Sequence, residues 1–340
     1  MKVIKILLVI VVVLVVGVTV GLWSYLKFAG DESHFAGTCE ALELGESAED
    51  MQIDRERGFA YLSLIDRMSL AKGESAQGWI GRLDLNATER SVEPALIDPP
   101  PHFRPHGVSL LVDAAGQRHL FVINHPENRG SEPESVESFR EEQPGRFRHV
   151  RTYTDTLFTS PNDIVAVGPA QFYIANDSNR GTTQLVYVDG DEIRAVADDI
   201  ASGGGINVSL DGGTLYIAET SGKRIRSMRR EPATGDVETI EMLDIGTSPD
   251  NIDVAADGSL WVGAHSNIIA LVMHFIAGAD APTQILQMLP GADGGADVTE
   301  IYLNRGEQIS AGSVGVTYGD ELLIGSITAR KILICEMDGA

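Results

Sequence analysis

Six short stretches recur along this chain, and each combines a polar start, an alternating apolar strand, a turn and a second apolar strand. Marker positions in the six second strands are Tyr61, Phe121, Tyr173, Tyr216, Trp261 and Leu323. The markers lie 60, 52, 43, 45 and 62 residues apart, which leaves room for about four strands in each unit. Six such units predict an all-β fold, a six-bladed β-propeller formed as one domain.

The polar residues at the six starts indicate a site. In a propeller the first strand of every blade lines the central axis, so residues at these starts would converge on one region. Five of the six starts supply Asp, Glu, Asn or His. The starts are Glu49-Asp50, His106-Gly107, Asn162-Asp163, Asn207, Asp250-Asn251 and Ser313. An oxygen-rich cluster of this kind suits a hard cation such as calcium.

The chain is strongly acidic, with a formal net charge of −23 over 340 residues. This charge argues against nucleic acid as a partner, because phosphate backbones are bound by Lys and Arg. A solvated acidic surface explains the charge, and attraction of cations toward acidic rims is compatible with it. The oligomeric state cannot be inferred from the sequence.

The N-terminus predicts a membrane anchor. Residues 6–26 contain no charged residue and are long enough to cross a bilayer as a helix. Lys2 and Lys5 precede this run, so the positive-inside rule places the body of the chain outside the cytoplasm. We expect a signal-anchor helix at 1–27, a stalk at 28–38 and the propeller at 39–340. A cleaved signal peptide, which would release a secreted protein, is the alternative.

The two cysteines bracket the predicted propeller. Cys39 precedes the first repeat and Cys335 follows the last one. Ring closure brings the two ends of a propeller together, so we predict a disulfide, which would persist in an oxidising compartment outside the cytoplasm. Two free buried thiols are the alternative.

Several motifs, in their order and spacing, resemble the paraoxonase/arylesterase family. They are Arg104-Pro105-His106-Gly107-Val108-Ser109, Asn124-His125-Pro126, Pro161-Asn162-Asp163-Ile164, Gly205-Ile206-Asn207-Val208, Asp250-Asn251-Ile252, Trp261-Val262-Gly263-Ala264-His265 and Cys335-Glu336. The resemblance runs from about Cys39 to Met337. It implies a six-bladed propeller with two calcium ions in its central tunnel, and hydrolysis of lactones and aryl esters.

The resemblance also implies roles for individual residues. Ligands of a catalytic calcium would be Glu49, Asn162, Asn207, Asp250 and Asn251. Ligands of a deeper structural calcium would be Asp50, Asp163 and the backbone carbonyl of Val108. His106 would be the active-site histidine with His125 behind it, and His265 would lie near the substrate pocket. Asp250 could also act as nucleophile or base. Asn207-Val208-Ser209 fits a glycosylation acceptor as well, but a position lining the axis would be inaccessible.

One departure from the family pattern affects the predicted site. Animal members carry an amphipathic helical insertion after the segment that corresponds to Asn176-Asp177, and this insertion covers the active site and touches lipid. Here a strand pattern resumes by Gln184, as expected for a microbial member, so the site should be more open and membrane attachment would rest on the N-terminal helix. We interpret 66–77 as a loop able to overhang the axis, and 127–145 as an exposed outer connection.

Two function classes follow from these observations. The leading hypothesis is a calcium-dependent hydrolase of lactones and aryl esters, with weaker activity on phosphotriesters. In this chemistry a cation polarises the carbonyl group, and His106 has a suitable pKa to deprotonate a water. Whether His106 is the base or shapes the pocket stays open at this stage. The alternative is a non-catalytic propeller that uses calcium for structure and binds a partner.

Overall fold

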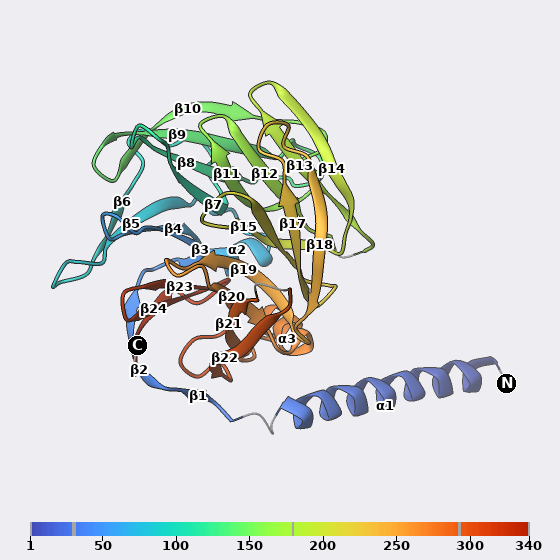
Figure 1. Cartoon of the computed structure of the whole chain (residues 1–340). Helices are drawn as coiled ribbons and strands as arrows, with labels where there is room; N and C mark the ends of the chain where they lie inside the picture. The colour runs from blue at the N-terminus through green and yellow to red at the C-terminus, as the bar shows by residue number, and fades with distance from the viewer. Residues whose placement is uncertain (1, 29–31, 179, 292–293, 339–340) are drawn as a thin grey trace.

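The computed structural model describes residues 2–28, 32–178, 180–291 and 294–338. Its strands form six sheets that fan around a common centre (Figure 1). The first strands of the sheets contact one another in a closed ring, in the order β3, β7, β11, β15, β19, β23 and back to β3. This arrangement confirms the predicted six-bladed propeller.

Blades 1 to 3 are each built from four consecutive strands. Blade 1 contains β3 (Ser47–Asp54), β4 (Phe59–Ile65), β5 (Trp79–Asp84) and β6 (Val92–Pro94). Blade 2 contains β7 (Pro105–Val112), β8 (Arg118–Asn124), β9 (Ser135–Gln143) and β10 (Arg146–Tyr153). Blade 3 contains β11 (Pro161–Gly168), β12 (Gln171–Asn176), β13 (Thr183–Asp189) and β14 (Glu192–Ile200).

Blade 4 repeats this pattern, and blades 5 and 6 each gain a strand from the N-terminal segment. Blade 4 contains β15 (Gly203–Val208), β16 (Thr214–Glu219), β17 (Arg224–Arg230) and β18 (Val237–Asp244). Blade 5 contains β19 (Ser248–Val254), β20 (Leu260–His265), β21 (Thr283–Pro290), β22 (Ala296–Asn304) and the added β1 (His34–Phe35). Blade 6 contains β23 (Gly312–Tyr318), β24 (Glu321–Ser326), β25 (Lys331–Met337) and the added β2 (Gly37–Glu43).

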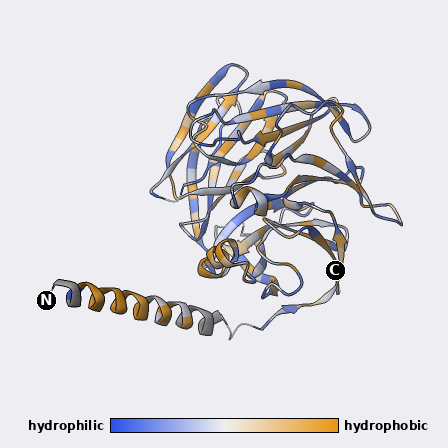
Figure 2. Ribbon diagram, turned by 180° about the vertical axis from the view of Figure 1, so that it is seen from behind, coloured by the Kyte–Doolittle hydropathy of each residue, from blue (hydrophilic) through white to orange (hydrophobic). Residues whose placement is uncertain are grey.

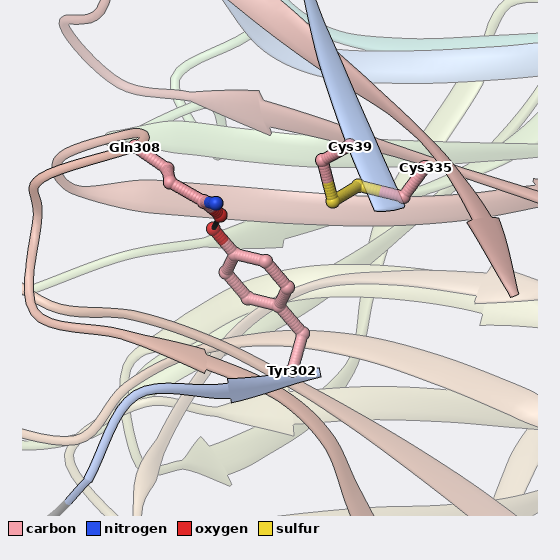
Figure 3. Close-up of a disulfide and its surroundings, with 4 residues drawn as sticks. All are labelled: Cys39, Tyr302, Gln308 and Cys335. Carbon is pink, nitrogen blue, oxygen red and sulfur yellow. Dashed lines mark hydrogen bonds between the residues drawn. A yellow bond between two sulfur atoms is a disulfide. The ribbon is translucent and has the colours of Figure 1, made fainter. Parts of the chain in front are cut away.

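The ring is closed by the added strand of blade 6 and by a disulfide. β2 pairs antiparallel with β25 along its full length, and Cys39 faces Cys335 in the register. The two sulfur atoms are bonded at 2.07 Å (Figure 3), which confirms the predicted bridge. Part of the predicted stalk, residues 28–38, is strand: β1 and the start of β2 pair with the outer strands of two blades. Residues 29–31 of that stalk lie outside the described residues.

Alternating side chains of the strands pack between neighbouring blades rather than around one centre. At the seam between the first and last blades, Met51 and Leu62 pack with Val316 and Leu323 in a single buried cluster. The seam is therefore held by apolar burial as well as by covalent closure.

Three helices lie outside the described sheets. α1 (Lys2–Phe28) contains the apolar stretch Lys5–Leu22, which is not buried and is long enough to cross a membrane, as a signal sequence would also be. α2 (Arg67–Ala71) and α3 (Ile268–Ala277) each connect the second and third strands of a blade.

The interpretation of 127–145 as an outer connection is wrong in part, since β9 pairs with both β8 and β10 there.

Candidate active site

A local irregularity repeats at the start of the first strand in every blade. The register of that strand against its neighbour shifts between Ala48 and Met51, and between Pro249 and Ile252. Comparable shifts occur in the other four blades. Bulges of this kind aim side chains away from the regular ladder and are frequent at functional sites. They lie at five of the six predicted polar starts, while Asn207 is back in register with Tyr216.

Two glycines allow the first strands to approach each other closely. A Cβ atom on Gly107 would lie 2.6 Å from the backbone oxygen of Asn162, and one on Gly205 would lie 2.4 Å from the backbone oxygen of Asp250. A side chain at either position would therefore push apart strands that carry predicted ligands.

Glu49 lies at the centre of the site and is buried. Its backbone oxygen accepts hydrogen bonds from the Asn251 amide at 3.0 Å and the Ser313 hydroxyl at 2.6 Å. Its Oε1 accepts a second hydrogen bond from Asn251 at 2.9 Å, and its Oε2 lies 3.3 Å from Nε2 of His106. Burial alone would raise its pKa, but His106, Arg67 and Asn251 together lower it to about 2. Glu49 is consequently an anion held in place from three directions.

The two predicted histidines are in contact, and a glutamate continues the chain behind them. Nδ1 of His106 lies 2.6 Å from Nε2 of His125, and Nδ1 of His125 lies 2.6 Å from a carboxylate oxygen of Glu134. Arg129 donates to the other oxygen of Glu134 at 2.8 Å. Burial lowers the pKa of His125 to about 3, and the positive charge of Arg129 acts in the same direction.

This chain of contacts fixes the tautomers. An ionised carboxylate accepts and does not donate, so the proton on His125 lies on Nδ1, toward Glu134. Nε2 of His125 is then an acceptor, and Nδ1 of His106 must donate to it. In neutral His106 the lone pair then lies on Nε2, whereas protonated His106 also carries a proton on Nε2, 3.3 Å from the Glu49 carboxylate.

Two residues at the site were missed by the sequence analysis. Arg67, the first residue of α2, is buried; it donates to the backbone oxygen of Pro105 at 2.9 Å and approaches Glu49 at 3.7 Å. Burial lowers its pKa, and Glu49, Asp50 and Asp250 oppose that shift. Glu134 lies in a segment interpreted as an outer connection. Neither belongs to a repeated polar start, so the periodic signal gave no indication of them.

Asp250 and His265 form a buried pair near Glu49. Nε2 of His265 lies 3.0 Å from Oδ2 of Asp250. Burial raises the pKa of Asp250, and the neighbouring charge of Glu49 raises it further, while His265 lowers it. The hydrogen bond fixes the orientation of the carboxylate, and Nδ1 of His265 is buried without a hydrogen-bond partner.

Asp50 and Asp163 form a second buried acidic pair. Asp50 accepts hydrogen bonds from the backbone N–H groups of Met51 and Val108, each at 2.7 Å. Asp163 likewise accepts from Ile164 and Ile206, each at 2.7 Å. Burial raises the pKa of both carboxyl groups, and the carboxylates around them add to the shift. These acids therefore repel each other in a region with little positive charge to balance them.

The unpaired oxygens of the site fit a cation. Oε2 of Glu49, Oδ1 of Asn162 and Oδ1 of Asn251 are buried without a hydrogen-bond partner, and each comes from a predicted ligand of the catalytic calcium. Buried polar atoms normally find partners. Across the described ranges, no group of three or more His, Cys, Asp or Glu side chains has the arrangement of a metal site. Calcium also takes amide and backbone oxygens, and two of these three atoms are amide oxygens.

The remaining predicted ligands have other contacts. Asn207 donates to the backbone oxygen of Ile252 at 2.8 Å, and its Oδ1 accepts from the Val208 N–H at 2.8 Å. The backbone N–H of Val108 donates a hydrogen bond to the carboxylate of Asp50. The structure thus brings Asn251 and His106 each into contact with Glu49, whereas Asn207 is hydrogen-bonded to Ile252 of blade 5.

A cavity of about 750 Å³ leads to the histidines. Its lining includes His106, His125 and Arg67, together with Phe275 of α3 and Ile327. Residues of the 66–77 loop also line it, in agreement with the expectation that this loop would approach the axis. The volume is in the usual range for small-molecule sites.

Solved structures similar to this one support the fold. A luciferin-regenerating enzyme superposes with a TM-score of 0.57 at 11% identity, covering 89% of this chain and 96% of that one. A calcium-binding protein, regucalcin, from Agrobacterium tumefaciens superposes with a TM-score of 0.52 at 16% identity, covering 89% and 93%. At such identities the likeness concerns the fold alone.

Sequence comparison is more specific. Residues 74–337 match the Arylesterase family. Serum paraoxonase/arylesterase 1 of Rattus norvegicus is 31% identical over 284 residues, 77% of this chain and 78% of its own length. Serum paraoxonase/arylesterase 2 of Homo sapiens is 31% identical over 253 residues, 69% of each chain. With the histidine pair and the acidic axis in place, this chain belongs to the arylesterase family of paraoxonase-like six-bladed propellers.

Proposed function

We propose that this protein is a calcium-dependent hydrolase of lactones and aryl esters, with weaker activity on phosphotriesters. The observation that carries the proposal is the cluster of unpaired oxygens from Glu49, Asn162 and Asn251 beside the free Nε2 of His106. The family supports a hydrolase of esters in general. A cation site next to a base is one arrangement that can catalyse ester hydrolysis.

Two calcium ions are part of the proposal. The first would be held by Glu49, Asn162, Asn207, Asp250 and Asn251, and the second by Asp50, Asp163 and the carbonyl of Val108. When bound, the first ion would supply a positive charge that polarises the substrate carbonyl and balances the oxyanion formed on attack. The second would neutralise the repulsion between the two deeper carboxylates.

The chain's own residues handle the proton. Nε2 of His106 accepts a proton from a water as that water attacks the carbonyl carbon. The resulting imidazolium lies 3.3 Å from the Glu49 carboxylate, which stabilises its charge. After the acyl C–O bond breaks, the same nitrogen returns the proton to the leaving alkoxide. His125 and Glu134 keep His106 in the tautomer that leaves Nε2 free.

Arg67, Asp250 and His265 complete the proposed machinery. Arg67 holds Glu49 toward the axis and lines the cavity. His265 holds the Asp250 carboxylate as a proposed ligand, and it is a proposed neighbour of the substrate.

The proposed location follows from α1 and the disulfide. We propose that α1 anchors the protein in a membrane with the propeller outside the cytoplasm, or that the propeller is secreted if α1 is cleaved. A disulfide persists in an oxidising compartment.

The direct test is hydrolysis of a panel of lactones and aryl esters by the purified full chain, before and after prolonged treatment with a calcium chelator. We expect turnover that is lost on chelation and restored by added calcium. Turnover unchanged by chelation would overturn the calcium mechanism. Absence of hydrolysis across the panel with calcium present would favour a non-catalytic scaffold.

A further inference from the structure

α3 presents its apolar side chains to solvent. Its sequence has no Asp, Glu, Lys or Arg, and none of its residues is buried. Ile276 is 74% exposed and Val272 is 48% exposed, and exposure of this order extends to Ile268, Ile269 and Met273. A contiguous exposed apolar surface normally marks an interaction site.

The caps at both ends of α3 and its single polar side chain hold this orientation. Asn267 caps the N-terminus by accepting from the Ala270 N–H at 3.0 Å, and Gly278 ends the helix in the left-handed conformation with φ 66°. His274 is turned toward the protein, where Nε2 lies 2.7 Å from the hydroxyl of Thr328 in blade 6. The polar residue faces the propeller and the apolar residues face outward, the reverse of an ordinary surface helix.

α3 and the N-terminal helix belong to the same side of the molecule. α3 connects β20 and β21, and β1 adds to β22 of the same sheet. α1 and α3 approach each other to within 8 Å between Cα atoms, and both are predominantly hydrophobic in Figure 2. Five residues separate Phe28 from His34, and a chain of that length reaches at most about 20 Å. Blade 5 is thus tethered close to whatever surface holds α1.

We propose that α3 docks on the surface of the lipid bilayer that α1 crosses, with its apolar side chains inserted at the boundary between head groups and acyl chains. The proposal rests on the proposed anchoring by α1. Because α3 has no acidic or basic residue other than His274 and the chain carries a net charge of −23, apolar burial rather than attraction to anionic lipid would hold it. Phe275 of α3 lines the cavity, so the cavity would open beside the bilayer.

The test places a fluorescent probe on α3 in the full chain. Both cysteines of the sequence are joined in the disulfide, so an introduced thiol can be labelled alone. Ile276→Cys carries an NBD group, and Leu210→Cys is the matched control. Leu210 is 65% exposed and lies in the turn between β15 and β16, in blade 4 and not in blade 5, which carries α3. Each protein is reconstituted in phosphatidylcholine vesicles that contain nitroxide-labelled lipid, and flotation shows whether it is anchored.

We expect the label at Ile276 to shift to shorter wavelength and to be quenched several-fold more strongly than the label at Leu210. Adding Val272→Asp should reduce the quenching at Ile276 by at least half, whereas adding Leu210→Asp should not. Equal and weak quenching at both positions in floating vesicles would overturn the docking and leave the anchor intact.

Two further outcomes would also overturn the proposal. If the chain does not float, both the anchor and the docking fail. Lactone hydrolysis by the same preparation then shows whether the proposed function still holds. If the Ile276 label becomes buried in detergent without vesicles as protein concentration rises, α3 is an interface between copies of this chain. The labelled proteins are first compared by melting temperature, so the quenching comparison stands even if Val272→Asp does not fold.

Discussion

Glu49 and Asp50 are neighbours in β3, but the pKa of the first is lowered and that of the second is raised. Around Glu49, histidine, arginine and amide groups lower the pKa of the carboxyl group to about 2, yet one of its oxygens has no hydrogen bond. Around Asp50, both carboxylate oxygens accept backbone N–H groups, yet burial and Asp163 raise the pKa. The first region is the proposed site of the catalytic cation, beside the proposed base His106. The second is satisfied in its hydrogen bonds and deficient in positive charge, as expected of a purely structural cation site.

The sharpest way to break this comparison is to remove one acid from each region. Asp250→Ala should reduce turnover by about 10²–10³-fold, because it deletes a proposed charged ligand of the cation that would stabilise the oxyanion. Asp163→Ala should instead lower the melting temperature, because the deeper ion would contribute to folding free energy. Lactone hydrolysis and thermal unfolding, each at saturating calcium, measure the two effects. An active Asp250→Ala together with an unaltered melting temperature for Asp163→Ala would show that the division is wrong.

The closure of the ring gives a second large effect. Cys335→Ser should lower the free energy of unfolding by a few kcal/mol, up to about 5 kcal/mol in the loop-closure model, because the bridge joins residues 296 positions apart. Calcium loss should become easier, since Glu49 and Asp50 lie on the strand next to the seam. Denaturant unfolding measures the first effect and a chelator titration the second. Turnover per folded molecule is the control and should be retained. An unfolding free energy equal to that of the unaltered protein would contradict the role given to the bridge.

A smaller effect should separate the base from the ligands. Glu134→Gln should reduce kcat by roughly 10–100-fold, in the range found when an orienting partner is lost, because a glutamine can donate to His125 and allow the wrong tautomer. KM and calcium affinity should change little, since Glu134 lies behind the histidines. The matched control is Glu132→Gln, an exposed carboxylate two residues away that binds Asn128. A kcat unchanged by Glu134→Gln would remove Glu134 from the proton path.

The smallest effect is a pH dependence of stability. The pKa of His125 falls to about 3 in the folded protein, and that of Glu134 is also lowered. Below pH ~6.5 the unfolded chain therefore takes up a proton at His125 that the folded protein does not, so stability falls as the pH drops toward 3. His125→Asn should make this fall shallower between pH 6.5 and 4.5, as measured by urea unfolding at several pH values. The slope of the unaltered protein is the reference, and an identical slope would contradict the assignment.

The periodic signals predicted the ring, the seam and the axis residues, because all of these repeat from blade to blade. The contact of Glu49 with Asn251 joins residues 202 positions apart, and it was predictable because both lie at strand starts. Arg67 and Glu134 were not predictable in this way. Each lies between the second and third strands of its blade, in a segment whose sequence does not recur in the other blades. Its position depends on how that segment folds over the axis.

The N-terminal segment has a mechanical consequence. β1 is joined to blade 5 over only two residue pairs, whereas β2 is joined to β25 over seven. A pull on α1 would first peel β1 away and then load the start of β2. The bond at Cys39 lies at the third residue of β2, so peeling would stop after Gly37 and Thr38. Beyond that point the force would pass through the disulfide into β25, so the propeller would stay closed under tension.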